Sequence, residues 1–174
     1  IELDPNSIDA RRAMALSLAF TGDYAAAIEQ YLTAIDINPN LDLLYFELAP
    51  YYIIQEDYEA AQALYDTVLE HNPRNVNAWT RKCETYFRER DDSAAFDACS
   101  NALDLDDENP DIYKLMGMIQ YTRRDYEGSV ESFAACVSLM DEQEWTDDER
   151  HGECYMLQGL AESYRDHCEI GLSL

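Results

Sequence analysis

Apolar and polar residues alternate along the chain at the spacing of amphipathic helices. In the clearest example, one apolar stripe runs through residues 41–55 and a second follows residue 57. The positions of the two stripes are Leu44, Leu48, Tyr51 and Tyr52, then Ala61, Leu64, Tyr65, Val68 and Leu69. Pro73 is expected to end the second stripe, because a proline cannot continue the helical hydrogen-bond ladder. The pattern predicts two helices joined by a short turn.

This two-helix pattern recurs with a period of 34 residues. An aspartate holds the same place in each copy, at Asp23, Asp57, Asp91 and Asp125. We expect each aspartate to cap a second helix, because its carboxylate accepts the free N–H groups of the first turn. The period divides residues 8–41, 42–75, 76–109 and 110–143 into four copies of one unit. A fixed period of this length is typical of a repeat array.

The register changes after Asp125. Residues 155–160 echo residues 113–118 at an offset of 42, so residues 144–174 are predicted to form an irregular, incomplete fifth repeat. Thr146, three residues before Glu149, is expected to open its helix as a capping box. Residues 168–172 are expected to begin a further helix. Residues 1–7 match the close of a preceding repeat, so residues 1–174 are interpreted as one repeat domain cut from a longer array.

The repeat resembles the tetratricopeptide repeat family. That family has an aromatic residue, Leu, a small residue and Tyr on the first helix, then Ala, an aromatic residue and Pro on the second. The second block supplies Tyr45, Leu48, Ala49, Tyr52, Ala61, Tyr65 and Pro73 at these places. The third and fourth blocks depart by placing Asp107 and Asp141 where the closing proline would stand. The resemblance implies an all-α fold, a right-handed solenoid of antiparallel helix pairs.

The charge of the chain narrows the possible partners. Its 12 basic and 36 acidic residues give a net charge of −24, which repels a phosphate backbone, so nucleic acid is not expected as a partner. Basic peptides would be attracted, or the acidity serves only solubility. No stretch approaches the roughly 18 apolar residues that would span a bilayer, so no membrane insertion is expected.

Five cysteines, an odd number, match no disulfide scaffold. A reducing, cytoplasmic location is therefore expected. Cys83 and Cys136 stand where the family places small residues for close helix contact, so they are interpreted as inert thiols of the core.

No catalytic or metal-binding set of residues is expected from the sequence. The chain has neither a glycine-rich phosphate loop nor a serine in a nucleophile elbow, so no catalytic residue and no cofactor are expected. Zinc would accept His151 and Cys154 with His167 and Cys168, but their spacing matches no zinc module. They are interpreted as structural residues, and no metal site is expected.

Candidate ligand contacts follow from the resemblance, which places the first helix of each pair on a concave face. The candidates are Arg12, Leu16, Phe20, Phe46, Ile54, Asn77, Arg81, Arg88, Lys114, Met118 and Tyr121. The apolar members would anchor a ligand. The arginines either meet the ligand or pair with acids such as Glu84 and Glu89 at helical spacing.

The sequence thus predicts a non-enzymatic scaffold that binds a peptide or partner segment in its concave groove. The alternative is a regulatory or assembly region of a larger enzyme or signalling protein whose catalytic domain lies outside this segment. Self-association through the terminal repeats is a further possibility.

Overall fold

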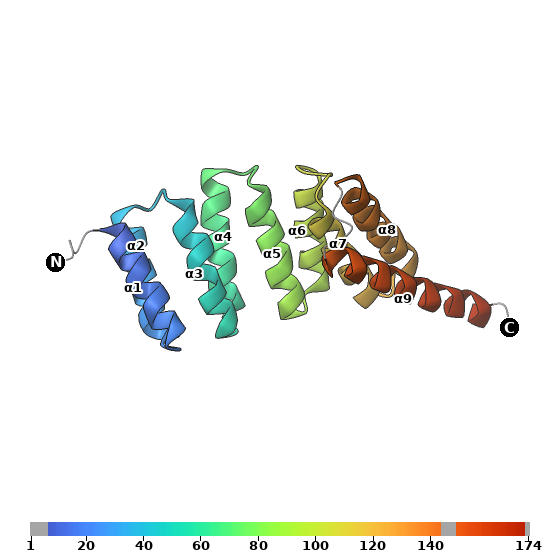
Figure 1. The fold of residues 1–174 in the computed structure, drawn as a ribbon, viewed down its shortest axis with the longest axis horizontal. Coiled ribbons are helices and arrows are strands. Elements are labelled where there is room, and N and C mark those ends of the chain that lie inside the picture. Colours follow the sequence, from blue (N-terminus) through green and yellow to red (C-terminus); the bar gives the residue numbers. More distant parts are fainter. Residues whose placement is uncertain (1–6, 144–148, 173–174) are drawn as a thin grey trace. The chain divides into compact units, whose positions relative to one another are not determined.

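The computed structural model describes residues 7–143 and 149–172. All regular elements within these residues are α-helices (Figure 1). They are α1 (Ile8–Phe20), α2 (Tyr24–Ile37), α3 (Asp42–Ile54), α4 (Tyr58–His71), α5 (Val76–Glu89), α6 (Asp92–Leu103), α7 (Pro110–Thr122), α8 (Tyr126–Glu142) and α9 (Glu149–Leu172). The predicted all-α fold is confirmed. None of these helices combines the length and apolarity needed to cross a membrane.

The helices fall into two compact units, Ile1–Ala78 and Trp79–Leu174. In the first unit α1 packs on α2, α3 packs on α4, and α2 contacts α3. In the second unit α7 packs on α8, α8 packs on α9, and α6 contacts α7. Within each unit, helices that are neighbours in the sequence are therefore neighbours in space, as in an array of helix pairs.

Each capping aspartate begins the second helix of its pair, as predicted. The Asp57 carboxylate accepts the backbone N–H of Ala60 at 3.1 Å, and the other three aspartates make the same bond at 3.0–3.1 Å. The same aspartate also ends the first helix. The backbone N–H of Asp57 donates to the Tyr52 carbonyl and that of Glu56 donates to the Ile53 carbonyl. This pair of bonds is a Schellman motif, which satisfies carbonyls left open at a helix C-terminus.

The residue before each capping aspartate adopts a positive φ, which is the left-handed conformation that a Schellman motif requires. Only the first of these four positions holds a glycine, Gly22, with φ at 85°. The others are Glu56, Arg90 and Arg124, with φ at 60°, 70° and 64°. A side chain at such a φ costs roughly 1–2 kcal/mol. Three of the four turns therefore carry backbone strain.

The core of the first unit is built from small and aromatic side chains on facing helices. Ala15, Ala27 and Tyr31 pack with Leu44 and Leu48 in one buried cluster. A second cluster joins α3 to α4 through Ala49, Ala61 and Tyr65. Leu44, Leu48, Ala49, Ala61 and Tyr65 of these clusters were placed on the apolar stripes or at family signature positions by the sequence.

In the second unit, a glycine allows close contact between α7 and α8. A Cβ atom placed on Gly117 would lie 2.8 Å from the ring of Phe133. The hydroxyl of Ser129 donates to the Gly117 carbonyl at 2.8 Å and is itself buried. The absence of a side chain at Gly117 therefore sets the distance between these helices.

Two disulfide bonds cross-link the second unit, and they correct the interpretation of its cysteines. Cys83 on α5 is bonded to Cys99 on α6, with 5.2 Å between their Cα atoms. Cys136 on α8 is bonded to Cys154 on α9, with 6.5 Å between their Cα atoms. Cys83 and Cys136 are therefore not free thiols. The small-residue positions that they occupy are where helices approach most closely, within the 4.4–6.8 Å that a disulfide spans.

The fifth repeat departs from expectation in one respect. Residues 168–172, predicted to begin a new helix, are instead the last turns of α9, which is continuous from Glu149 to Leu172. That prediction is wrong because no proline or capping turn precedes Cys168, so the helical spacing continues. Thr146, the predicted cap, lies outside the described residues.

Candidate functional site

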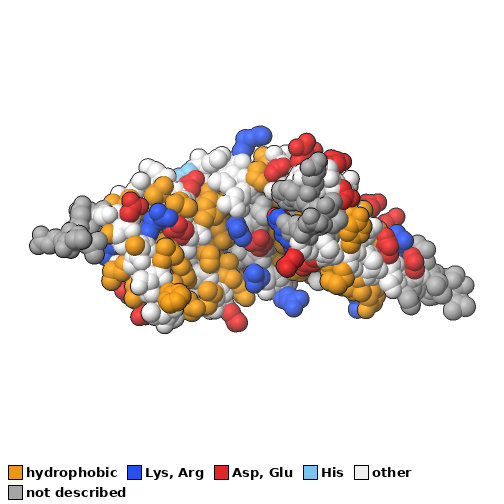
Figure 2. Space-filling view, in the orientation of Figure 1, with side chains coloured by type: hydrophobic (Ala, Val, Ile, Leu, Met, Phe, Trp, Pro, Cys, Tyr) orange, Lys and Arg blue, Asp and Glu red, His pale blue; other side chains and the backbone are white. Residues whose placement is uncertain are grey.

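Four of the candidate contacts in the first unit are apolar, and three of them are largely exposed. Phe20 at the end of α1 is 93% exposed, and Leu16 and Ile54 are more than half exposed. Phe46 is half-buried instead, and its ring lies 5.9 Å from the ring of Tyr65. Figure 2 shows hydrophobic side chains at the surface of this unit. The first unit therefore offers apolar side chains to solvent.

Arg12, the charged candidate of the first unit, already has partners within it. Its guanidinium forms two hydrogen bonds with the carboxylate of Glu47 on α3, one of 2.8 Å from Nε, and lies 3.6 Å from the Asp9 carboxylate. The hydrogen bond with Glu47 raises the pKa of Arg12 above its usual value. This bidentate pair joins α1 to α3, so Arg12 has a structural role.

The candidates on α5 differ in their surroundings. Asn77, Arg81 and Arg88 are exposed, and the Arg81 guanidinium donates to Glu84 at 2.9 Å. Internal pairing, one of the two alternatives for these arginines, therefore occurs at Arg81. The neighbouring Lys82 is only 8% exposed, with its ammonium 5.7 Å from the centres of two aromatic rings.

The contact between α7 and α9 changes in character along its length. At its beginning, two ion pairs join the helices, with the ammonium of Lys114 3.1 Å from Glu153. At its other end, the rings of Tyr121 and Tyr164 meet at 5.6 Å. Lys114, predicted as a ligand contact, is thus engaged within the protein.

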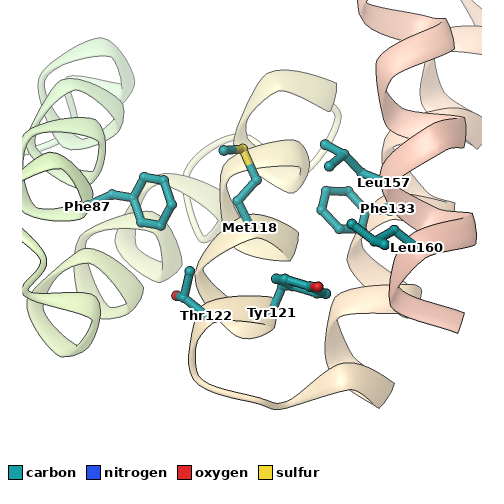
Figure 3. Close-up of a pocket in the computed structure, with 7 residues that line it drawn as sticks. All are labelled: Phe87, Met118, Tyr121, Thr122, Phe133, Leu157 and Leu160. Carbon is teal, nitrogen blue, oxygen red and sulfur yellow. The ribbon is translucent and has the colours of Figure 1, made fainter. Parts of the chain in front are cut away.

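Between these two ends lies an apolar pocket of about 130 Å³ that opens to solvent. Its lining is almost wholly apolar. The lining residues are Phe87, Met118, Tyr121, Thr122, Phe133, Leu157 and Leu160. Figure 3 shows Phe87 of α5 on one side, Leu157 and Leu160 of α9 on the other, and side chains of α7 between them. This volume is below the roughly 300–1,000 Å³ of pockets that hold a whole small-molecule ligand.

The structure brings two candidates, Met118 and Tyr121, together in this pocket. Five lining residues were missed by the sequence analysis, and two of them had a usable signal. Phe87 stands 34 residues before Tyr121, which is one repeat length. Leu160 stands 42 residues after Met118, which is the offset of the fifth repeat. The same rule that selected Met118 and Tyr121 would have selected both.

The chemistry of the pocket is that of binding. Its heteroatoms are a thioether and two hydroxyls, with no ionisable pair arranged for proton transfer among the lining residues. Cys154, considered as a zinc ligand, is held in a disulfide. Within the described residues, no group of three or more His, Cys, Asp or Glu side chains is placed to hold a metal ion.

Paired helices with capped turns define a helical repeat protein. Tetratricopeptide repeat models match residues 52–119 and residues 13–41, which together exceed half of the chain. The chain belongs to the tetratricopeptide repeat family.

Solved structures share this fold. MamA (41-end) from Desulfovibrio magneticus RS-1 matches with a TM-score of 0.69 and 20% identity, over 80% of this chain and 78% of that one. YrrB, described as a TPR protein with an unusual peptide-binding site, matches with a TM-score of 0.66 and 15% identity. The match covers 94% of this chain and 80% of YrrB. The TPR2B domain of yeast Sti1, in a complex with pHsp70, matches with a TM-score of 0.64 and 16% identity. The match covers 70% of this chain and 96% of that domain. At these identities the likeness concerns the fold.

Proposed function

We propose that this chain is a non-enzymatic protein-interaction scaffold, and that the pocket of its second unit holds one large apolar side chain of a partner segment. The observation that carries the proposal is the pocket itself, an apolar cavity open to solvent between α5, α7 and α9. Burial of an apolar side chain is worth about 1.5–3 kcal/mol, and such anchors dominate the energetics of interfaces.

Two proteins of the same fold support this use. YrrB is described as having a peptide-binding site, and the Sti1 domain was solved with pHsp70. Repeat folds of this kind present surfaces on which an extended segment can lie, so a peptide is a natural ligand class for this chain too.

Charge favours a basic partner segment. Residues 79–174 contain nine Lys and Arg against 23 Asp and Glu, so a peptide with lysine or arginine near its apolar anchor would be attracted to this unit. Such long-range attraction speeds the encounter more than it tightens the complex. We therefore assign affinity to the apolar anchor and the choice of partner to both features.

A displayed library of random peptides, selected on the immobilised chain, tests the proposal. We expect the enriched peptides to share one Leu, Ile, Met or Phe with a basic residue nearby. The Met118→Glu variant should bind the best peptide at least tenfold more weakly, because an acid at this position places a charge in the apolar pocket. Fluorescence anisotropy with the labelled peptide measures the affinity.

Met156→Glu is the matched control. Met156 lies on α9 and is 67% exposed, and it does not line the pocket. The same substitution there should leave peptide affinity within about twofold of the parent, since it adds one more acid to an already acidic unit. Equal loss in the two variants, or selected peptides without a shared apolar residue, would refute the proposal. Circular dichroism confirms that both variants remain helical.

A further inference from the structure

Two opposite walls of the apolar pocket each lie one helical turn from a disulfide. Cys83 precedes Phe87 by four residues on α5, and Cys154 precedes Leu157 by three residues on α9. Residues at these spacings share a face of a helix. The first unit, which lacks this pocket, contains no cysteine. The cross-links are therefore concentrated around the pocket.

The bond between Cys136 and Cys154 lies in a buried cluster where α8 meets α9. All four side chains of this buried cluster, the two cysteines with Val137 and Met140, are at most 7% exposed. The helices that it joins carry two parts of the pocket, because Phe133 belongs to α8 and Leu157 to α9. The position of the α9 wall relative to Phe133 therefore depends on this bond.

The two disulfides differ in how much else holds their helices together. Helices α5 and α6 are separated by two residues, 90–91, and joined by the capped turn that recurs through the array. Helices α8 and α9 are separated by six residues, 143–148. A longer connection constrains the helices that it joins less than a tight turn does. The cross-link to α9 therefore matters more than the one between α5 and α6.

The remaining contacts of α9 with α7 are partly exposed to solvent. Exposed ion pairs contribute little, typically below about 1 kcal/mol each. Among these contacts are the pairs Lys114–Glu153 and Asp111–Arg150 and the ring contact Tyr121–Tyr164. These contacts, like the packing of α9 on α8, are non-covalent, whereas Cys136–Cys154 links α9 to α8 covalently.

We infer that the pocket is redox-dependent: it binds its apolar anchor with the Cys136–Cys154 bond intact, and loses affinity when a dithiol reduces that bond. The inference rests on the proposed function, since it concerns the same pocket. Without the bond, α9 moves relative to α8, and Leu157 and Leu160 no longer face Phe133 at the spacing that the anchor fills.

The reaction is thiol–disulfide exchange. A thiolate of the dithiol attacks one sulfur of the bond, forming a mixed disulfide and releasing the other cysteine as a thiolate that takes up a proton. The second thiol of the reductant then displaces the first cysteine and closes its own disulfide. Two electrons and two protons pass from the dithiol to Cys136 and Cys154. A disulfide oxidant of the same class reverses the reaction.

Burial of the sulfurs gives the inference a second consequence. Both cysteines are fully buried, so a thiolate reaches them only when α8 and α9 separate locally. An anchor that contacts both helices opposes this separation. A bound peptide should therefore slow reduction, because coupling between two equilibria is reciprocal.

The test compares the chain prepared under oxidising conditions with the same chain after dithiothreitol, using the peptide from the library selection. Alkylation followed by mass spectrometry establishes which cysteines are reduced. We expect peptide affinity to fall at least tenfold once Cys136 and Cys154 are reduced. Cys136→Ala/Cys154→Ala should bind weakly with or without dithiothreitol. Cys83→Ala/Cys99→Ala, the matched control, should keep both the affinity and the response.

Three results would overturn the inference. The first is full affinity when alkylation shows both cysteines reduced, which leaves the proposed function intact. The second is alkylation of both cysteines in the oxidised chain, because the bond is then absent. The third is hydrogen exchange of the α9 amides at the same rate before and after reduction. This third result needs no peptide, so it is decisive even if the library selection and the proposed function fail. Faster exchange in α9 after reduction, with α7 unchanged, is the supporting result.

Discussion

Replacing Gly117 with alanine tests how tightly α7 and α8 are packed. The added Cβ would stand 2.8–2.9 Å from three ring atoms of Phe133, closer than real side chains approach. Phe133 is 1% exposed, so its ring is confined on most sides. One side faces the pocket that this ring lines. We expect Gly117→Ala to push the ring into that space.

The expected free-energy change combines two opposed effects. Alanine in a helix is favoured over glycine by about 1 kcal/mol. Overpacking a filled core costs typically about 1–3 kcal/mol. The sum is a loss of stability of about 0–2 kcal/mol, which a single variant would measure poorly. A second glycine in the chain removes this ambiguity.

Gly159 supplies the reference, because it holds on α9 the place that Gly117 holds on α7. Among the described residues, no atom other than those of its chain neighbours and its own helix backbone lies within 4 Å of a Cβ placed on Gly159. Gly159→Ala should therefore gain the helix preference alone, about 1 kcal/mol. The difference between the two variants isolates the overpacking cost, about 1–3 kcal/mol.

Urea unfolding followed by circular dichroism measures both variants. We expect a higher urea midpoint for Gly159→Ala and an unchanged or lower one for Gly117→Ala. In a Phe133→Leu background, Gly117→Ala should no longer be penalised, because the ring that it meets is gone. Equal gains for the two alanines in the parent chain would refute the close contact.

Two further predictions concern the turns. Asp57→Ala should lower stability by about 1 kcal/mol through loss of the cap, whereas Asp57→Asn should retain most of it, since an amide oxygen also accepts the helix N–H; equal losses in urea unfolding would contradict the capping role. Arg124→Gly should raise stability by roughly 1 kcal/mol by relieving a positive φ, and Gly22→Ala should lower it by a similar amount. Arg124→Ala separates charge from backbone and should give no gain, and a gain equal to that of glycine would assign the effect to charge.

The capped turns were predictable from the sequence because they are local. A cap depends on a residue and the three that follow it, so the recurring aspartates sufficed to place Asp57 and its equivalents. Their second role, in ending the preceding helix, was missed. The signal was weak, because Glu56, Arg90 and Arg124 stand where the left-handed turn favours glycine.

The disulfides could not be predicted because they join separate helices. Cys83 was placed correctly on the face where helices meet, but its partner Cys99 lies 16 residues away on the facing helix. Cys154 belongs to the irregular fifth repeat, where the 34-residue register fails. The expected cytoplasmic location stays a prediction, and disulfides are rare in that compartment.

The ligand contacts were only partly predictable, for a related reason. Met118 and Tyr121 could be selected from their place on α7, whereas Leu157 required knowing how α9 packs against it. Lys114 was selected as a ligand contact, but its ammonium forms an ion pair with Glu153, 39 residues later. Charged side chains on an acidic chain find internal partners that a repeat pattern does not reveal.

The chain has only two lysines, and neither projects freely from its surface. Lys82 is buried with its ammonium over two aromatic rings, and Lys114 is paired with Glu153. Reagents that acylate lysine amines, and enzymes that attach ubiquitin to them, therefore meet few side-chain acceptors on this chain. Of the two, Lys114 is the more accessible, so slow acylation there would report on how firmly α9 is seated against α7.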